Sequence, residues 1–154
     1  MTSRQPRHTQ GCSSSASDVY KRQQLEMEVA EQLVELIPCA EMVRFGKNGS
    51  DATSAAIRLA RAHTKKEHVA VCGYHGWQDW YIGSTSRDLG VPKATKELTH
   101  TFKYNNIESL ERIFSQNPNQ IAAVILEPMN THFPENDFLL NVKAMCQQYG
   151  AVLI

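Results

Sequence analysis

The chain has 154 residues, 42% of them hydrophobic and 21% charged, which is enough to bury the core of one ordinary globular domain. Sixteen basic residues balance sixteen acidic ones, so no net charge draws the chain to nucleic acid or to a membrane surface. The cysteines are widely spaced without a CxxC pair, and no apolar run has the length of a membrane span or the form of a signal peptide. This predicts a cytoplasmic protein with reduced thiols and no metal site.

Residues 1–23 differ in composition from everything that follows. They are rich in serine and arginine, nearly free of apolar residues and without periodicity, which predicts disorder. The string "SSSASDVYKRQ" resembles translated sequencing-adapter sequence, so we expect this segment to be non-native and dispensable. The folded region is therefore expected to be residues 24–154.

Residues 24–64 predict a helix, a strand and a second helix. "QQLEMEVAEQLVELIP" has helical apolar spacing and ends at Pro38, and "EMVRF" is a short strand candidate. A turn then leads into a helix whose expected packed face is Ala52, Ala56, Leu59, Ala60 and His63.

The turn "FGKNGSD" before this second helix is the first candidate binding feature. We expect Ser50 or Asp51 to cap the helix, and Gly46 and Gly49 to allow positive φ. Free amides at a helix start suit an anionic phosphate. On these residues alone, an ordinary capped helix after a turn is the simpler explanation.

The remainder alternates apolar strands with helices. "HVAVC" and "QIAAVILEP" read as buried strands, "AVLI" begins another, and residues 76–100 are irregular. One helix is expected within "YNNIESLERIFSQNP", capped by Asn105 or Asn106, with Ile107, Leu110, Ile113 and Phe114 as its buried stripe. Another is expected within "ENDFLLNVKAMCQQYG", ending at Gly150, with Phe138, Val142, Met145 and Tyr149 on its packed face. This alternation predicts an α/β fold with a mostly parallel sheet flanked by helices.

Polar segments follow three of the predicted strands. The glycine turn follows "EMVRF", "GYHGW" follows "HVAVC", and Glu127-Pro128 follows "IAAVIL". Ligands of parallel sheets bind beyond the carboxyl ends of the strands, so we expect these segments to form one site.

In this order, the segments "RFGKNGSDATSAAIRLARA", "GYHGW", "AAVILEP" and "FLLNVKAMCQQYGAVLI" resemble the class III aminotransferases, which are fold type I enzymes that use pyridoxal 5'-phosphate (PLP). Within this family, the residue pattern of these segments is similar to that of the glutamate-1-semialdehyde aminomutases. The resemblance implies part of the family's large domain, ending before the family's Asp-Glu pair and the lysine that holds PLP.

The resemblance also implies the cofactor-binding residues. The phosphate turn falls on Asn48, Gly49 and Ser50, and Tyr74, followed by His75, matches the aromatic that stacks on the pyridine ring. The alternative to a cofactor-binding role for Tyr74 and His75 is a structural one, in which they form a capped turn with a packed aromatic side chain. Glu127 matches the Glu-Pro near the cofactor's polar edge, while His132 stands where ornithine- and GABA-type relatives have a second Glu.

The resemblance implies that the complete protein transfers an amino group between a small-molecule amino donor and a carbonyl acceptor. It also implies that this complete protein is a homodimer. No catalytic residue falls within this chain, because Lys47, Lys93, Lys96 and Lys103 lie outside the matching context. We expect them to be surface groups, and Trp77 and Trp80 to serve in packing rather than in a substrate pocket. The chain alone is expected to be inactive and poorly soluble.

Two other readings stay open from the sequence. The glycine turn could belong to a non-catalytic α/β module that binds a phosphate metabolite. The chain could also be an unstable piece without a function of its own.

Overall fold

The computed structural model describes the backbone of residues 12–154 and the side chains from residue 23 onward. The chain divides into two compact units, Met1–Phe45 and Gly46–Ile154, each described by itself. No helix within the described part is both long and apolar enough to cross a bilayer.

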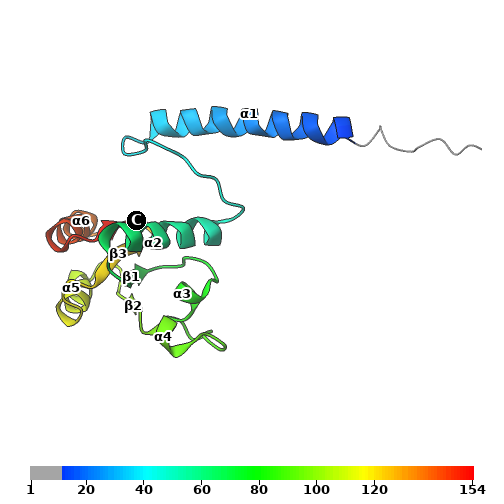
Figure 1. Cartoon of the computed structure of the whole chain (residues 1–154). Coiled ribbons are helices and arrows are strands. Elements are labelled where there is room, and N and C mark those ends of the chain that lie inside the picture. The colour runs from blue at the N-terminus through cyan, green and yellow to red at the C-terminus, as the bar shows by residue number, and fades with distance from the viewer. Residues whose placement is uncertain (1–11) are drawn as a thin grey trace, which may run out of the picture. The chain divides into compact units, whose positions relative to one another are not determined.

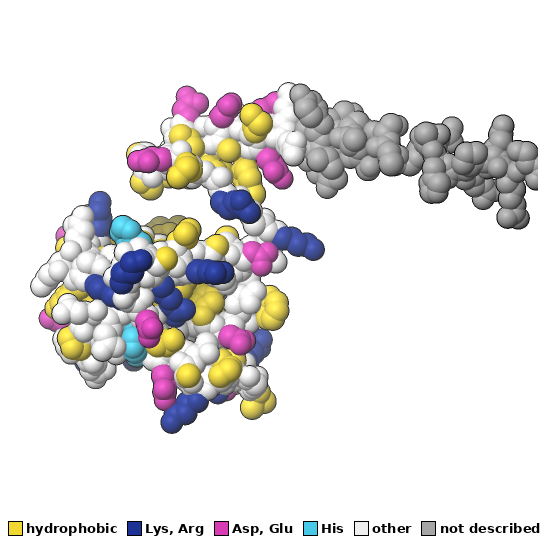
Figure 2. Space-filling view, viewed as in Figure 1, with side chains coloured by type: hydrophobic (Ala, Val, Ile, Leu, Met, Phe, Trp, Pro, Cys, Tyr) yellow, Lys and Arg dark blue, Asp and Glu magenta, His cyan; other side chains and the backbone are white. Residues whose placement is uncertain are grey.

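The first unit contains one long helix, α1 (Cys12–Leu36). It begins well before residue 24, so the prediction of a disordered tail is wrong for residues 12–23, while residues 1–11 lie outside the described residues. No glycine or proline occurs between Cys12 and Leu36, so nothing in the backbone interrupts the helix. Apolar side chains along the described part of α1 are exposed, Leu25 and Leu36 among them (Figure 2).

The strand expected at residues 41–45 is absent. These residues have no assigned strand pairing, and Glu41 lies in a bend. An extended segment becomes a strand only when a neighbouring strand accepts and donates its backbone hydrogen bonds. No strand pairing of residues 41–45 is found among the described residues, so their apolar side chains alone do not produce a strand.

The second unit is built on a four-stranded sheet with the order β2-β1-β3-β4. The strands are β1 (His68–Cys72), β2 (Thr99–Thr101), β3 (Ile121–Leu126) and β4 (Val152–Leu153), and every pairing is parallel. The predicted parallel α/β architecture is therefore confirmed. The edge strand β2 falls in the segment expected to be irregular.

The helices cover both faces of the sheet (Figure 1). On one face, α2 (Gly49–Thr64) and α3 (Asp79–Ile82) pack over Val69, Val71 and Ile125. On the other, α5 (Ile107–Gln116) and α6 (Phe138–Tyr149) pack over Ala70, Cys72 and Val124. The short helix α4 (Lys93–Lys96) precedes β2. Alternate residues of the central strands β1 and β3 thus enter opposite core layers, so these two strands are buried on both sides.

The caps of α5 and α6 agree with the predictions. Asn106 accepts a hydrogen bond from the Ser109 amide at 2.8 Å, and Gly150 ends α6 in the left-handed region at φ 60°. The predicted face of α2 is shifted, because Ile57 is buried together with Ala60 while Leu59 is 70% exposed.

Candidate functional site

The loop after β1 is held between α2 and β3 by two glycines. Gly73 and Gly76 have φ of +93° and +109°, in the region that favours glycine. A Cβ on Gly73 would lie 3.0 Å from Cδ of Glu127, and one on Gly76 would lie 2.9 Å from Cβ of Ser50. The loop therefore contacts the end of β3 and the start of α2 at once, and glycine is required at both contacts.

The start of α2 is fixed by its cap and by two bonds to this loop. Asn48, in extended conformation, caps the helix by accepting a hydrogen bond from the Asp51 amide at 3.0 Å. The Thr53 hydroxyl donates to the His75 carbonyl at 2.8 Å, and the Trp77 amide donates to Oγ of Ser50 at 3.4 Å. The predicted cap at Ser50 or Asp51 is thus wrong by two or three positions, since the extended residue before the first turn is Asn48.

Gly49 is the first residue of α2, and no other group among the described residues fills the space beside its backbone. The expectation of positive φ at Gly46 and Gly49 is wrong, because neither is among the positive-φ glycines. A Cβ on Gly49 would meet nothing within 4 Å. The space borders an open cavity of about 450 Å³ between the helix start and the loop after β1, lined by Asn48, Gly49, Ser50, Thr53, Tyr74, Gly76 and Trp77.

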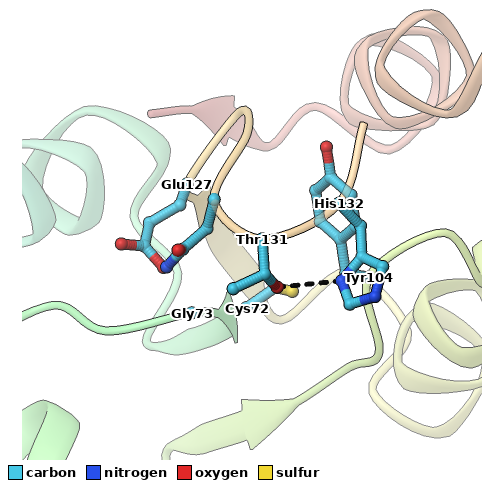
Figure 3. Close-up of a pocket in the computed structure, with 7 residues that line it drawn as sticks. Cys72, Gly73, Tyr104, Glu127, Thr131 and His132 are labelled. Atoms are coloured by element: carbon cyan, nitrogen blue, oxygen red, sulfur yellow. Dashed lines mark hydrogen bonds between the residues drawn. The ribbon is translucent and has the colours of Figure 1, made fainter. Parts of the chain in front are cut away.

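Glu127 links the loop after β1 to the end of β3. Its Oε2 accepts hydrogen bonds from the Tyr74 amide at 3.2 Å and from Nδ2 of Asn130 at 3.0 Å. The carboxylate lines a second cavity of about 190 Å³ (Figure 3), whose other lining residues are Cys72, Gly73, Tyr104, Asn130, Thr131 and His132. In this close-up, a hydrogen bond of 2.8 Å joins Thr131 and His132.

Burial determines the protonation states of two side chains packed under the loop after β1, His75 and Cys72. His75 is buried and its Nε2 donates to the Cys72 carbonyl at 2.9 Å. Burial lowers the pKa of His75, although this hydrogen bond and the Glu127 charge oppose the shift. Burial, and then the Glu127 carboxylate, raise the pKa of Cys72. We therefore expect a neutral imidazole and a protonated thiol here at neutral pH.

The structure brings five of the six predicted cofactor residues to one rim and places the side chain of the sixth, His75, beneath it. Asn48, Gly49, Ser50 and Tyr74 share the larger cavity, Glu127 bonds to the Tyr74 amide, and His75 lies beneath the loop. Asn48, Gly49 and Ser50 reach this rim from the start of α2, not from the end of a strand. Tyr74 is 66% exposed and meets Tyr81 edge to face at a centroid distance of 5.7 Å.

The tryptophans and lysines occupy different surroundings. Trp80 is buried in the core and its Nε1 donates to Ser54 at 2.9 Å, as expected for packing, whereas Trp77 is exposed and lines the larger cavity. Lys96 pairs with Asp88 at 2.6 Å and Lys93 with Glu97 at 3.6 Å. Among the described residues, no lysine lines either cavity.

Sequence reasoning missed several residues of the rim. Thr53, Tyr104, Asn130 and Thr131 line the cavities, although the sequence does not single them out as site residues. For Asn130 and Thr131, the available signal was their place in "EPMNTH", directly after a buried strand. No such sequence signal marks Tyr104, because the sequence does not predict the strand β2 that precedes it.

A parallel sheet covered on both faces, with a glycine-bounded rim at the carboxyl ends of its strands, is the arrangement of a ligand-binding α/β protein. The chain belongs to the class III aminotransferases, since the family model described as aminotransferase class-III matches residues 9–154.

Curated relatives agree with this assignment. The chain is 42% identical over 147 residues to a glutamate-1-semialdehyde 2,1-aminomutase of Alkaliphilus oremlandii, covering 85% of this chain and 34% of that protein. It is 36% identical over 138 residues to a 3-aminobutyryl-CoA aminotransferase of Cloacimonas acidaminovorans, covering 86% and 33%. The chain therefore spans about a third of the length of these relatives.

Solved structures give the same fold. An omega-transaminase from Sphaerobacter thermophilus matches with a TM-score of 0.73 and 29% identity, covering 83% of this chain and 34% of that one. The FumI protein of Sphingopyxis sp. MTA144, solved in a form with PLP, matches with a TM-score of 0.76 and 27% identity, covering 95% and 38%. The chain thus has the architecture of fold type I PLP transaminases.

Proposed function

We propose that the complete protein carrying this chain is a PLP-dependent enzyme that transfers an amino group between a small-molecule donor and a carbonyl acceptor, as an aminotransferase or as a 2,1-aminomutase. The chain would form the phosphate-binding part of the large domain, in a cytoplasmic homodimer that binds neither nucleic acid nor membrane. Family membership and the PLP forms of structural relatives support this proposal.

The geometry of the α2 start carries the proposal for the cofactor phosphate. At Gly49 the backbone borders open space, so an anion can approach the first amides of α2, where the helix dipole is positive. Oγ of Ser50 accepts from the Trp77 amide, which leaves its own hydrogen free to donate to the anion. These residues fit a phosphate dianion.

The other rim residues would orient the ring of the cofactor. Tyr74, exposed at the same cavity, would lie against a ring face, and its backbone is held by Glu127. The buried, neutral His75 keeps the loop in place through the Cys72 carbonyl. When bound, PLP supplies an electron sink for chemistry at the amino-bearing carbon.

This chain supplies binding and orientation, and we propose that it does not by itself catalyse the transfer. No described lysine lines either cavity, so the amine that such chemistry needs is absent from this rim. Incubating the purified chain with PLP and amino donors should give no keto acid beyond the rate of free PLP. A faster rate would contradict this assignment.

The proposal is tested by Gly49→Val in the complete protein. The added side chain enters open space, so the fold is retained, but it blocks the approach to the amides. Losing hydrogen bonds to a charged group costs about 1.5–3 kcal/mol, which raises the Kd for PLP about 10- to 100-fold. The matched control is Ala62→Val, at an exposed position of the same helix.

Absorbance titration with PLP and a turnover assay read the result. An unchanged Kd in Gly49→Val would show that the turn is only a structural cap. If the unsubstituted protein binds both PLP and inorganic phosphate at the turn but transfers no amino group from any donor, the non-catalytic phosphate-binding module replaces this proposal.

A further inference from the structure

The loop between β3 and α6 carries three of the residues that line the smaller cavity, Asn130, Thr131 and His132. Among the described residues, no backbone–backbone hydrogen bond involves residues 128–134. A segment without its own backbone bonding is held only by what neighbouring elements provide. The position of the cavity wall therefore depends on side-chain hydrogen bonds, of which the loop's own Asn130 makes one, to Glu127.

Two consecutive residues between β2 and α5 provide that support. Tyr104 donates from Oη to the Pro128 carbonyl at 2.6 Å, at the start of the loop. Asn105 donates from Nδ2 to the Phe133 carbonyl at 2.9 Å and accepts at Oδ1 from the Glu135 amide at 3.1 Å. The Asn105 side chain thus bonds two alternate backbone positions, as a peptide group of a neighbouring strand would.

The conformation of this support is itself specific. Asn105 has φ of +56°, a left-handed conformation that asparagine tolerates better than most residues. Asn106 beside it caps α5, and the Tyr104 ring meets Phe138 of α6 edge to face at a centroid distance of 5.0 Å. The support is consequently anchored in the core helices, while the loop it holds is exposed.

We propose that Tyr104 and Asn105 are positioning residues that hold the loop of residues 128–137 against the smaller cavity, and so determine which amino donors the site accepts. This part of the proposal rests on the proposed function. The pair acts through Asn130, Thr131 and His132, which border the Glu127 carboxylate. None of the three hydrogen bonds that Tyr104 and Asn105 make to the loop involves a residue at the start of α2, where we propose that the phosphate binds.

The test uses Tyr104→Phe, Asn105→Gly and Asn105→Asp in the complete protein. Glycine keeps the left-handed backbone and removes both amide bonds, while aspartate keeps the acceptor for the Glu135 amide. Two matched controls exist within the chain. Asn119→Gly changes another left-handed asparagine at φ +58°, and Tyr149→Phe changes a tyrosine that stacks on Phe114 at 4.5 Å.

The first readout is independent of activity. Cys72 is 8% exposed and lines the same cavity, so loosening the loop exposes its thiol. We expect iodoacetamide to alkylate Cys72 about tenfold faster in Asn105→Gly, less so in Asn105→Asp and Tyr104→Phe, and at the original rate in both controls. Peptide mass spectrometry separates Cys72 from the other three cysteines of the chain, Cys12, Cys39 and Cys146. An unchanged rate in Asn105→Gly would overturn the positioning role.

The second readout tests the link to the substrate. With L-alanine, L-glutamate and 4-aminobutyrate as donors, Asn105→Gly should raise KM and alter the ratio of kcat/KM between donors while the Kd for PLP stays unchanged. Faster Cys72 alkylation with unaltered donor ratios would overturn the role in substrate choice. If the unsubstituted protein uses no donor, the proposed function fails, and Cys72 alkylation alone then decides whether the pair holds the loop.

Discussion

The contact between Gly76 and Ser50 offers the sharpest test of how the rim is built. Gly76 has φ of +109°, and a Cβ there would lie 2.9 Å from Cβ and 3.1 Å from Cα of Ser50. In Gly76→Ala, alanine in the left-handed region costs about 1–2 kcal/mol, and the overlap with Ser50 adds about 1–3 kcal/mol. Part of this strain is relieved if Ser50 moves away.

The variant Gly90→Ala separates the conformational cost of alanine at positive φ from the cost of the overlap with Ser50. Gly90 also has positive φ, at +86°, but a Cβ there meets nothing within 4 Å. It therefore carries the conformational cost of about 1–2 kcal/mol without the overlap. The difference between the two variants isolates the contact with Ser50.

Displacement of Ser50 should weaken binding of the cofactor phosphate. A lost hydrogen bond to a charged group raises the Kd for PLP about 10- to 100-fold in Gly76→Ala, with no change in Gly90→Ala. Combining Gly76→Ala with Ser50→Ala should give less than the product of the single effects, because the hydroxyl is already displaced. Equal Kd values for the two glycine variants would refute the idea that this contact positions Ser50.

Three further predictions follow from the pKa shifts and from the first unit. Because burial and then Glu127 raise the pKa of Cys72, Glu127→Gln should lower the pH at which iodoacetamide alkylates Cys72; a profile that stays in place would contradict the charge effect. Burial, and then the charge of His68, lower the pKa of His100 from 6.5, so below about pH 6.5 the unfolded chain binds more protons than the folded one. Urea unfolding should therefore show stability lost as pH falls below 6.5, with a shallower slope in His100→Gln; equal slopes would exclude this histidine as the cause. Although α1 begins at Cys12, the apolar side chains Leu25, Met27 and Leu36 farther along it are exposed, so deleting residues 1–23 should leave the thermal unfolding temperature of the complete protein unchanged. A loss of several degrees would show that the segment is structural.

The periodic elements of the second unit could be predicted because local pattern and tertiary environment agree. Residues 121–126 form a continuous apolar run, and burial on both faces of a parallel strand requires that pattern. Thr99–Thr101 carries no such signal. Its sequence Thr-His-Thr is polar, and only pairing with β1 at the sheet edge makes it a strand.

Elements that depend on a partner were mispredicted. Residues 41–45 have the apolar and aromatic content of a short strand, but no strand pairing of these residues is found in the described part of the chain. The cap of α2 was assigned to Ser50 or Asp51 because both are good capping residues, yet the backbone turns at Asn48, and Ser50 is then free to meet the loop after β1. Residue type identifies a capping candidate, whereas backbone conformation decides which candidate is used.

The same distinction explains why the sequence identified the rim but not its bracing. A binding turn is local, so Asn48, Gly49 and Ser50 stand together in the chain. The bracing is long-range. Glu127 bonds the Tyr74 amide 53 positions away, and Asn105 bonds Phe133 28 positions away. Since these bonds form within the chain itself, the strand ends and their loops are ordered before any ligand arrives, which lowers the entropy that binding would otherwise cost.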